Sequence, residues 1–147
     1  MKETILKLFL RDLEKLKTEI SSFKDEKNIW KISGDIKNSS GNLCLHLCGN
    51  LQHFIGGVLG NSGYVRNRDA EFSRKNVPLQ ELVIEIESTI KIVDKTLNEL
   101  KEEKLKEIFP SNVFGYEMTT EFFLVHLTTH LNYHLGQINY HRRLIDN

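Results

Sequence analysis

The chain has 147 residues, and its 20 lysine and arginine residues are balanced by 20 aspartate and glutamate residues. A chain of this length buries enough apolar surface to fold as one domain, which we expect to span residues 1–147. The neutral balance argues against nucleic acid as the main partner, because proteins that bind DNA or RNA usually carry a basic excess. No apolar run approaches the roughly 20 residues that cross a bilayer, and the charged N-terminus lacks a signal-peptide core. We therefore expect a cytoplasmic protein that does not enter the membrane.

The first predicted element is an amphipathic helix over residues 5–23. Its apolar residues recur at alternating steps of three and four, which is the stripe of a helix that packs on one side. A polar stretch follows over residues 24–40, where we expect turns or extended chain. A second helix begins near Ser39 or Ser40, because either serine can cap a helix. Its apolar line consists of Leu43, Leu47, Leu51, Phe54 and Val58, and it ends among the clustered glycines Gly56, Gly57, Gly60 and Gly63.

Two further long helices are predicted in the second half of the chain. The third begins at Pro78, because proline suits the first helical turn, and its apolar stripe leads towards Phe109. The fourth begins around Thr119 or Thr120 and runs to about Leu144. Four long helices without period-two strands predict an all-α fold, a four-helix bundle.

The connection between the second and third predicted helices, Asn61–Asn76, is unusually long. It mixes charges of both signs with aromatic residues, and functional residues often lie on loops of this length. Arg66 and Arg68 are candidate substrate-binding residues, because guanidinium groups pair with carboxylate or phosphate groups. The alternative is that both arginines are solvated or form ion pairs with Asp69 and Glu71.

Two cysteines, Cys44 and Cys48, lie four residues apart on the second predicted helix. A disulfide framework would need more cysteines, spread through loops. We therefore interpret both as small buried side chains, and Cys48 as a metal ligand is the less favoured alternative.

Four of the six histidines fall within sixteen residues of the fourth predicted helix: His126, His130, His134 and His141. His130 and His134 occupy or flank the inward line of this helix, where an ordinary bundle would place leucine. Residues four apart on a helix lie one turn above each other, with Cβ atoms about 5–6 Å apart, so two such imidazoles can share one metal ion. The spacing allows the pair 126 and 130 or the pair 130 and 134, whereas 126 and 134 are about 12 Å apart along the axis and cannot share an ion.

His46, beside the apolar line of the second helix, is a candidate for the third ligand. The alternative is that these rings are hydrogen-bonded or surface side chains, but leaving polar rings unpaired in a bundle core costs free energy. Three nitrogen donors leave a coordination position open, which is typical of reactive rather than structural sites. Histidine ligands suit zinc, nickel, copper or iron, and we expect zinc or nickel.

The chain resembles the DinB-like (YfiT-like) superfamily of four-helix metalloproteins in three motifs. These are His46-Leu-Cys-Gly-Asn50 on the second helix, Arg66-Asn-Arg-Asp-Ala-Glu-Phe72 in the loop, and His130-Leu-Asn-Tyr-His134-Leu-Gly-Gln-Ile138 on the fourth. The order of elements and the total length also fit, so the resemblance covers most of the chain. In this superfamily a helix-two histidine and a helix-four HxxxH pair bind the ion. The resemblance therefore implies that His46, His130 and His134 are the ligands and that His126 is a neighbour.

Three residues near the implied ligands are candidates for orienting them. Asn50 lies one turn after His46, Gln137 lies three residues after His134, and His126 lies one turn before His130. Polar groups beside metal ligands commonly fix their orientation. The alternative for Gln137 is a role in helix packing.

The loop motif looks like that of a branch whose members are largely without assigned activity, whereas characterised relatives include transferases and isomerases that use low-molecular-weight thiols. A bound dication lowers the pKa of water or thiol, or polarises an electrophile. We therefore predict a metal-dependent transferase that uses a low-molecular-weight thiol, or a hydrolase, acting on a small molecule. The alternative is a non-catalytic metal-binding module of a stress-response or interaction type. A homodimer is expected, because dimers are the commonest oligomers and the superfamily often pairs through helix faces.

Overall fold

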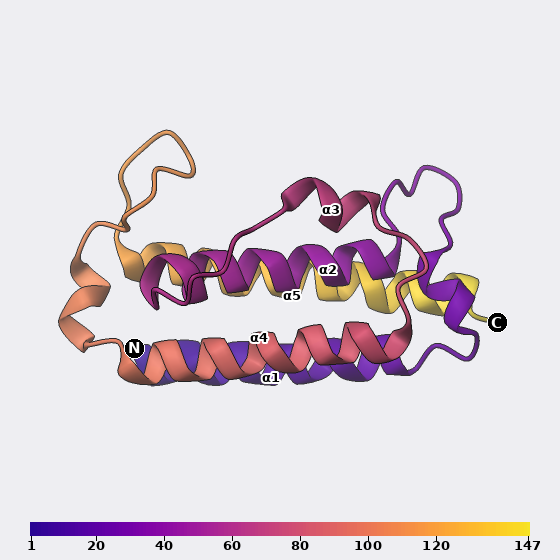
Figure 1. Cartoon of the computed structure of the whole chain (residues 1–147), viewed down its shortest axis with the longest axis horizontal. Coiled ribbons are helices and arrows are strands. Elements are labelled where there is room, and N and C mark those ends of the chain that lie inside the picture. The colour runs from indigo at the N-terminus through magenta and orange to yellow at the C-terminus, as the bar shows by residue number, and fades with distance from the viewer.

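The computed structural model describes all 147 residues and is built from helices without a β-strand (Figure 1). The long elements are α1 (Lys2–Ser21), α2 (Ser40–Leu51) with its continuation η2 (Gln52–Leu59), α4 (Leu79–Glu99) and α5 (Thr120–Ile145). Shorter elements lie in the connections: η1 (Glu26–Trp30), α3 (Arg68–Ser73) and η3 (Glu102–Lys106). The all-α prediction is confirmed. None of the helices combines the length and the apolar content that crossing a membrane would require.

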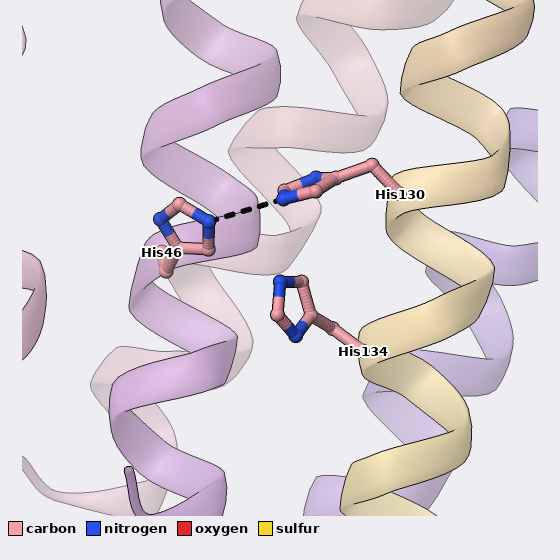
Figure 2. A group of neighbouring side chains, drawn as sticks. All are labelled: His46, His130 and His134. Carbon is pink, nitrogen blue, oxygen red and sulfur yellow. Dashed lines mark hydrogen bonds between the residues drawn. The ribbon is translucent and has the colours of Figure 1, made fainter. Parts of the chain in front are cut away.

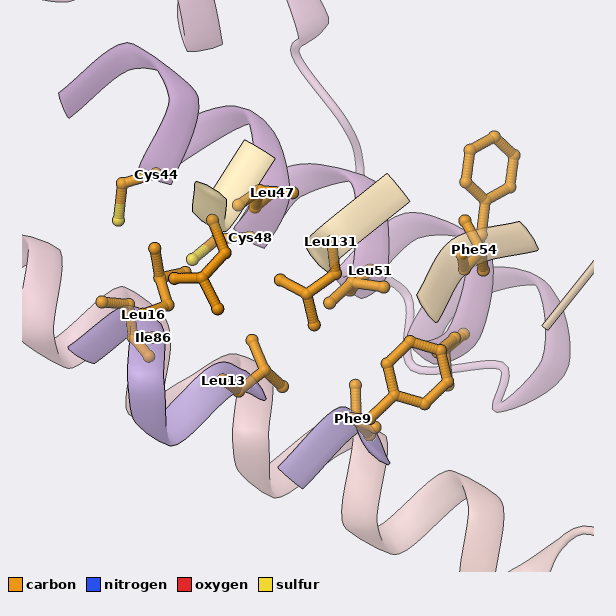
Figure 3. Close-up of a cluster of buried hydrophobic side chains, with 14 of the residues drawn as sticks. Phe9, Leu13, Leu16, Cys44, Leu47, Cys48, Leu51, Phe54, Ile86 and Leu131 are labelled. Atoms are coloured by element: carbon orange, nitrogen blue, oxygen red, sulfur yellow. The ribbon is translucent and has the colours of Figure 1, made fainter. Parts of the chain in front are cut away.

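The long helices form two layers around a shared core. Figure 1 shows α2 and α5 in one layer and α1 and α4 in the other, with α3 lying on the outer side of α2. A single cluster of 29 buried hydrophobic residues fills the interior, and Figure 3 shows part of it, including Leu13, Leu47 and Leu131. Cys44 and Cys48 are free thiols within this cluster.

The two helices that carry the site begin where the sequence predicts, and a side chain caps each of them. The Ser39 hydroxyl accepts a hydrogen bond from the Asn42 amide at the start of α2, and the Thr119 hydroxyl accepts one from the Phe122 amide at the start of α5. Each cap satisfies an amide that the first helical turn leaves without a partner. The two helices that carry the histidines therefore start at well-defined positions.

The far end of the second helix differs from the ordinary α-helix that its pattern predicts. Residues 52–59 form a π-helix, in which each turn is wider and the buried face shifts. Ile55 is therefore fully buried, whereas Val58, on the predicted apolar line, is only half-buried. Gly56 allows the wide turn to lie close to α4, because an added Cβ would be 2.8 Å from Ile92 Cγ1.

Two boundaries were also predicted incorrectly. α4 ends at Glu99, well before Phe109, because Leu100 is extended and Lys2 Nζ donates to the carbonyl oxygen of Leu100 at 2.7 Å. The connection after η2 contains α3 and is not wholly irregular. Asn67 caps this helix by accepting a hydrogen bond from the Ala70 amide, and six residues are too few for a periodic pattern to reveal.

Candidate metal centre

Three imidazole rings point into one space between α2 and α5: His46 from α2, and His130 and His134 from α5 (Figure 2). One nitrogen from each ring lies within 4.8 Å of the others, so the three could hold a metal ion. The Nε2 atoms of His46 and His130 are 3.2 Å apart. Two nitrogens bound at 2.0–2.1 Å to a tetrahedral ion lie about 3.3 Å apart. The spacing of His46 and His130 therefore matches that of two ligands of a single ion, and His134 lies beside them.

Hydrogen bonds fix the outer nitrogen of two of these rings. His46 Nδ1 is 3.0 Å from Glu71 Oε1, and His134 Nδ1 is 2.7 Å from Gln137 Oε1. Because the partners are oxygen acceptors, each Nδ1 carries the proton and each Nε2 presents a lone pair. Gln137 thus lies where an orienting partner of His134 was expected.

His130 completes the group but lacks such a partner. Its Nδ1 is buried and makes no hydrogen bond, while its Nε2 faces the Nε2 lone pair of His46. With its proton on Nδ1, His130 would turn a second lone pair towards the first, an arrangement that a shared cation stabilises. The donor set is therefore chemically suited to a divalent ion.

The contact of Glu71 with His46 was missed by reasoning from sequence, which considered Glu71 only as an ion-pair partner of the arginines. The Glu71 side chain is only 6% exposed, and it lies between His46 and the Arg66 guanidinium, whose Nε is 2.8 Å from Oε2 and whose Nη2 is 2.9 Å from Oε1. Burial alone would raise the pKa of Glu71, but the hydrogen bonds from His46 and Arg66 outweigh burial and lower it. Glu71 is therefore held as a carboxylate that accepts a hydrogen bond from His46 Nδ1–H.

Contacts between α2 and α3 hold Glu71 in this position. Gly49 leaves room for its carboxylate, since an added Cβ would be 2.7 Å from Glu71 Cδ. The Asn42 side-chain amide donates to the carbonyl oxygens of Glu71 and Arg74, each at 2.9 Å. Gly49 lies inside the second predicted helix, seven residues before the glycine cluster that begins at Gly56. A glycine within a helix, with no turn to explain it, was the signal that another segment approaches α2 here.

The other predicted site residues line a cavity of about 320 Å³ beside His46 and His130. Arg66 and Arg68 both reach it, but Arg66 is paired with Glu71, whereas the Arg68 guanidinium lies 5.2 Å from the centre of the Phe72 ring. Asn50 also lines it, and its buried Oδ1 has no hydrogen-bond partner. We call this space the arginine-side cavity.

His126 lies on the wall of the arginine-side cavity and outside the three-histidine group. Its ring packs edge-on against Phe114, with centroids 4.7 Å apart, and is inclined by 28° to the His130 ring, whose centroid is 6.2 Å away. Burial lowers the pKa of His126, so the ring is neutral at pH 7. Of the two pairs that helical spacing allowed, the structure brings together His130 and His134.

The ionisation of His130 gives a testable pH dependence for the metal-free protein. Burial, followed by the neighbouring His134 and His46, lowers the pKa of His130 to about 4. An unfolded histidine titrates near pH 6.5, so the unfolded state binds more protons between these values. The free energy of unfolding should therefore fall as the pH is lowered from about 6.5 towards 4. In denaturant titrations at pH 7 and pH 5 without metal, His130→Gln should lose less stability than the wild type, and an equal loss would contradict this account.

Comparison with known proteins places the chain among its relatives. Residues 5–147 match the model of a family described as "Protein of unknown function (DUF1572)". The chain belongs to the DUF1572 family. No curated protein matches this DUF1572 member. The fold is similar to the crystal structure of a conserved protein from Enterococcus faecalis, with a TM-score of 0.79 and 16% identity over 99% of this chain and 96% of that chain. At this identity the likeness shows only that this DUF1572 chain shares the fold.

Proposed function

We propose that the chain binds one divalent cation, zinc or nickel, through His46, His130 and His134, and that it is a metal-dependent transferase or hydrolase acting on a small molecule. The main support for this proposal is the hydrogen bonding of the three imidazole rings. Two Nε2 lone pairs are fixed inwards by hydrogen bonds on the opposite nitrogens, and the third ring has a buried nitrogen without a partner. The motifs shared with the DinB-like superfamily support the same three ligands.

The residues around the rings suit a small anionic reactant. When bound, such a cation lowers the pKa of a coordinated water or thiol, so that the anion is available at neutral pH. Arg68, which forms no ion pair, offers its guanidinium to a carboxylate or phosphate group in the arginine-side cavity. Asn50 presents an unpaired carbonyl oxygen that can accept a hydrogen bond from the reactant. His126, neutral at pH 7, can take up the proton of a thiol or water there.

Metal analysis with cobalt substitution tests this proposal. Untagged protein, purified without chelators and dialysed, should contain about one divalent ion per chain. Cobalt-loaded protein should change its visible spectrum when cysteine or 2-mercaptoethanol is added, because three protein ligands leave a position open. A protein without stoichiometric metal that also fails to take up zinc or nickel would refute the proposal. A cobalt spectrum unchanged by thiols or by azide would refute the catalytic part and favour an ion that only ties α2 to α5.

A further inference from the structure

A second and larger cavity, of about 560 Å³, lies on the other side of the histidine group. It is bounded by α5 and by the segment 35–38 that precedes α2, and His134 and Gln137 form part of its wall. We call it the tyrosine-side cavity, because Tyr133 and Tyr140 project from α5 at its edge. Volumes of roughly 300–1,000 Å³ are typical of sites that enclose small organic ligands.

The tyrosine-side cavity differs in character from the arginine-side cavity. Its apolar lining comes from Ile36, Leu43 and Leu144 together with the two tyrosine rings. Asp35 and Lys37 are its acidic and basic side chains, and their charges cancel. The arginine-side cavity, in contrast, is lined by two guanidinium groups and by no carboxylate.

Buried contacts beneath the tyrosine-side cavity fix the positions of its walls. His141, which is buried, has its Nε2 2.8 Å from the carbonyl oxygen of Lys31 and so ties the segment before α2 to α5. Trp30 packs its ring against Gly41, where an added Cβ would lie 2.7 Å from the indole. The tyrosine rings are largely exposed, Tyr133 at 63% and Tyr140 at 73%, and the Tyr133 ring lies edge-on to His134 with centroids 5.2 Å apart. Large aromatic rings beside a preformed apolar hollow are typical of a ligand site.

We infer that the tyrosine-side cavity binds an uncharged aromatic or aliphatic small molecule, while the arginine-side cavity holds a charged thiol. This inference rests on the proposed function and narrows it to a reaction with two organic reactants, one on each side of the histidine group. In that reaction the thiol sulfur forms a bond to an electrophilic carbon of the uncharged reactant. The bond from that carbon to its leaving group breaks with both electrons going to the leaving group, and the thiol proton passes to His126 and from there to solvent. Hydrolysis would require only one organic reactant and leaves the second cavity without a role.

Binding of simple probes to the metal-free protein tests the assignment independently of metal content. In ¹⁵N-resolved NMR titrations, 4-nitroanisole, an uncharged aromatic, should shift amides of segment 35–38 and of residues 133–144. Mercaptosuccinate, an anionic thiol, should instead shift amides around Arg66 and Arg68. Tyr133→Ala and Tyr140→Ala should each weaken the binding of 4-nitroanisole by up to about tenfold, as expected for the loss of one aromatic contact.

Phe122→Ala is the matched control, because Phe122 is an exposed aromatic residue of the same helix, 51% exposed, that lies outside the cavity. It should leave 4-nitroanisole binding unchanged. Shifts from 4-nitroanisole centred on the arginine side, or equal weakening by all three variants, would overturn the inference. Protein that is dimeric in sedimentation, with its tyrosine-side amides insensitive to 4-nitroanisole, would show a second copy of the chain as the occupant and would overturn it as well. A failure of the metal analysis alone would refute the proposed function and leave these binding results intact.

Discussion

Replacement of His130 by alanine is expected to abolish stoichiometric binding of zinc while the metal-free protein remains folded. The His130 ring contacts both other members of the group, with its centroid 5.1 Å from that of His46 and 4.6 Å from that of His134. Because residues that merely orient a ligand change metal affinity 10–100-fold, loss of a ligand should cost at least about a hundredfold. The fold should tolerate the change, since His130 is not part of the hydrophobic core and the substitution removes a buried nitrogen without a partner.

Calorimetric titration with zinc, paired with thermal unfolding with and without zinc, measures this effect. In the wild type, zinc at about a thousand times its dissociation constant should stabilise the folded state by about 4 kcal/mol. His53→Ala is the matched control, because His53 is a half-buried histidine on η2 that lies outside the three-histidine group. His53→Ala should bind zinc as the wild type does. Equal stabilisation of His130→Ala and the wild type by zinc would show that the ion lies elsewhere.

Gly49→Ala is expected to destabilise the protein, although the same change usually stabilises a helix. Alanine has a helix propensity about 1 kcal/mol more favourable than that of glycine. At position 49, however, the new Cβ would occupy the space of the Glu71 side chain, with Cδ only 2.7 Å away. The carboxylate would have to move away from His46 and Arg66, leaving the half-buried Arg66 guanidinium without its partner. We expect a loss of about 1–3 kcal/mol in the free energy of unfolding, as for other overpacked interiors.

Gly136→Ala provides the control for this prediction. Gly136 also lies within a helix, α5, but a Cβ added there would meet nothing within 4 Å. Gly136→Ala should therefore stabilise the protein by up to about 1 kcal/mol. Urea denaturation of both variants tests the difference in sign. Zinc titrations add a second readout, because Gly49→Ala and Glu71→Gln should both weaken zinc binding by about 10–100-fold. A stabilised Gly49→Ala variant with normal zinc affinity would contradict the role given to Glu71.

The parts of the fold and site that follow a helical period could be predicted from the sequence. The apolar stripes predicted the long helices, and the spacing of four residues predicted that His130 and His134 lie on adjacent turns. The inward position of His46 followed from the apolar line of α2, which the structure shows facing α5. These inferences succeed because one helix fixes the relative positions of all its residues.

The features that could not be predicted depend on tertiary packing, in particular on where the irregular segments pack against the bundle. Glu71 reaches His46 from 25 residues away through a six-residue helix, and no period connects the two positions. The π-helix at 52–59 exchanges i→i+4 for i→i+5 hydrogen bonds, a choice set by packing against α4 rather than by local propensity. The tyrosine-side cavity likewise depends on the path of residues 35–38, which have no regular structure.

The placement of Glu71 on α3 also bears on how fast a bound ion would be released. Of the residues of α3, only Glu71 is fully buried, whereas α2 is buried along its whole length. Short peripheral elements with few buried contacts detach at a small fraction of the free energy needed to unfold a domain. Transient detachment of α3 would free His46 from its carboxylate while the bundle stays intact. The lifetime of the metal-bound protein would then be set by how often α3 detaches. Amide hydrogen exchange across residues 68–73 should report that frequency.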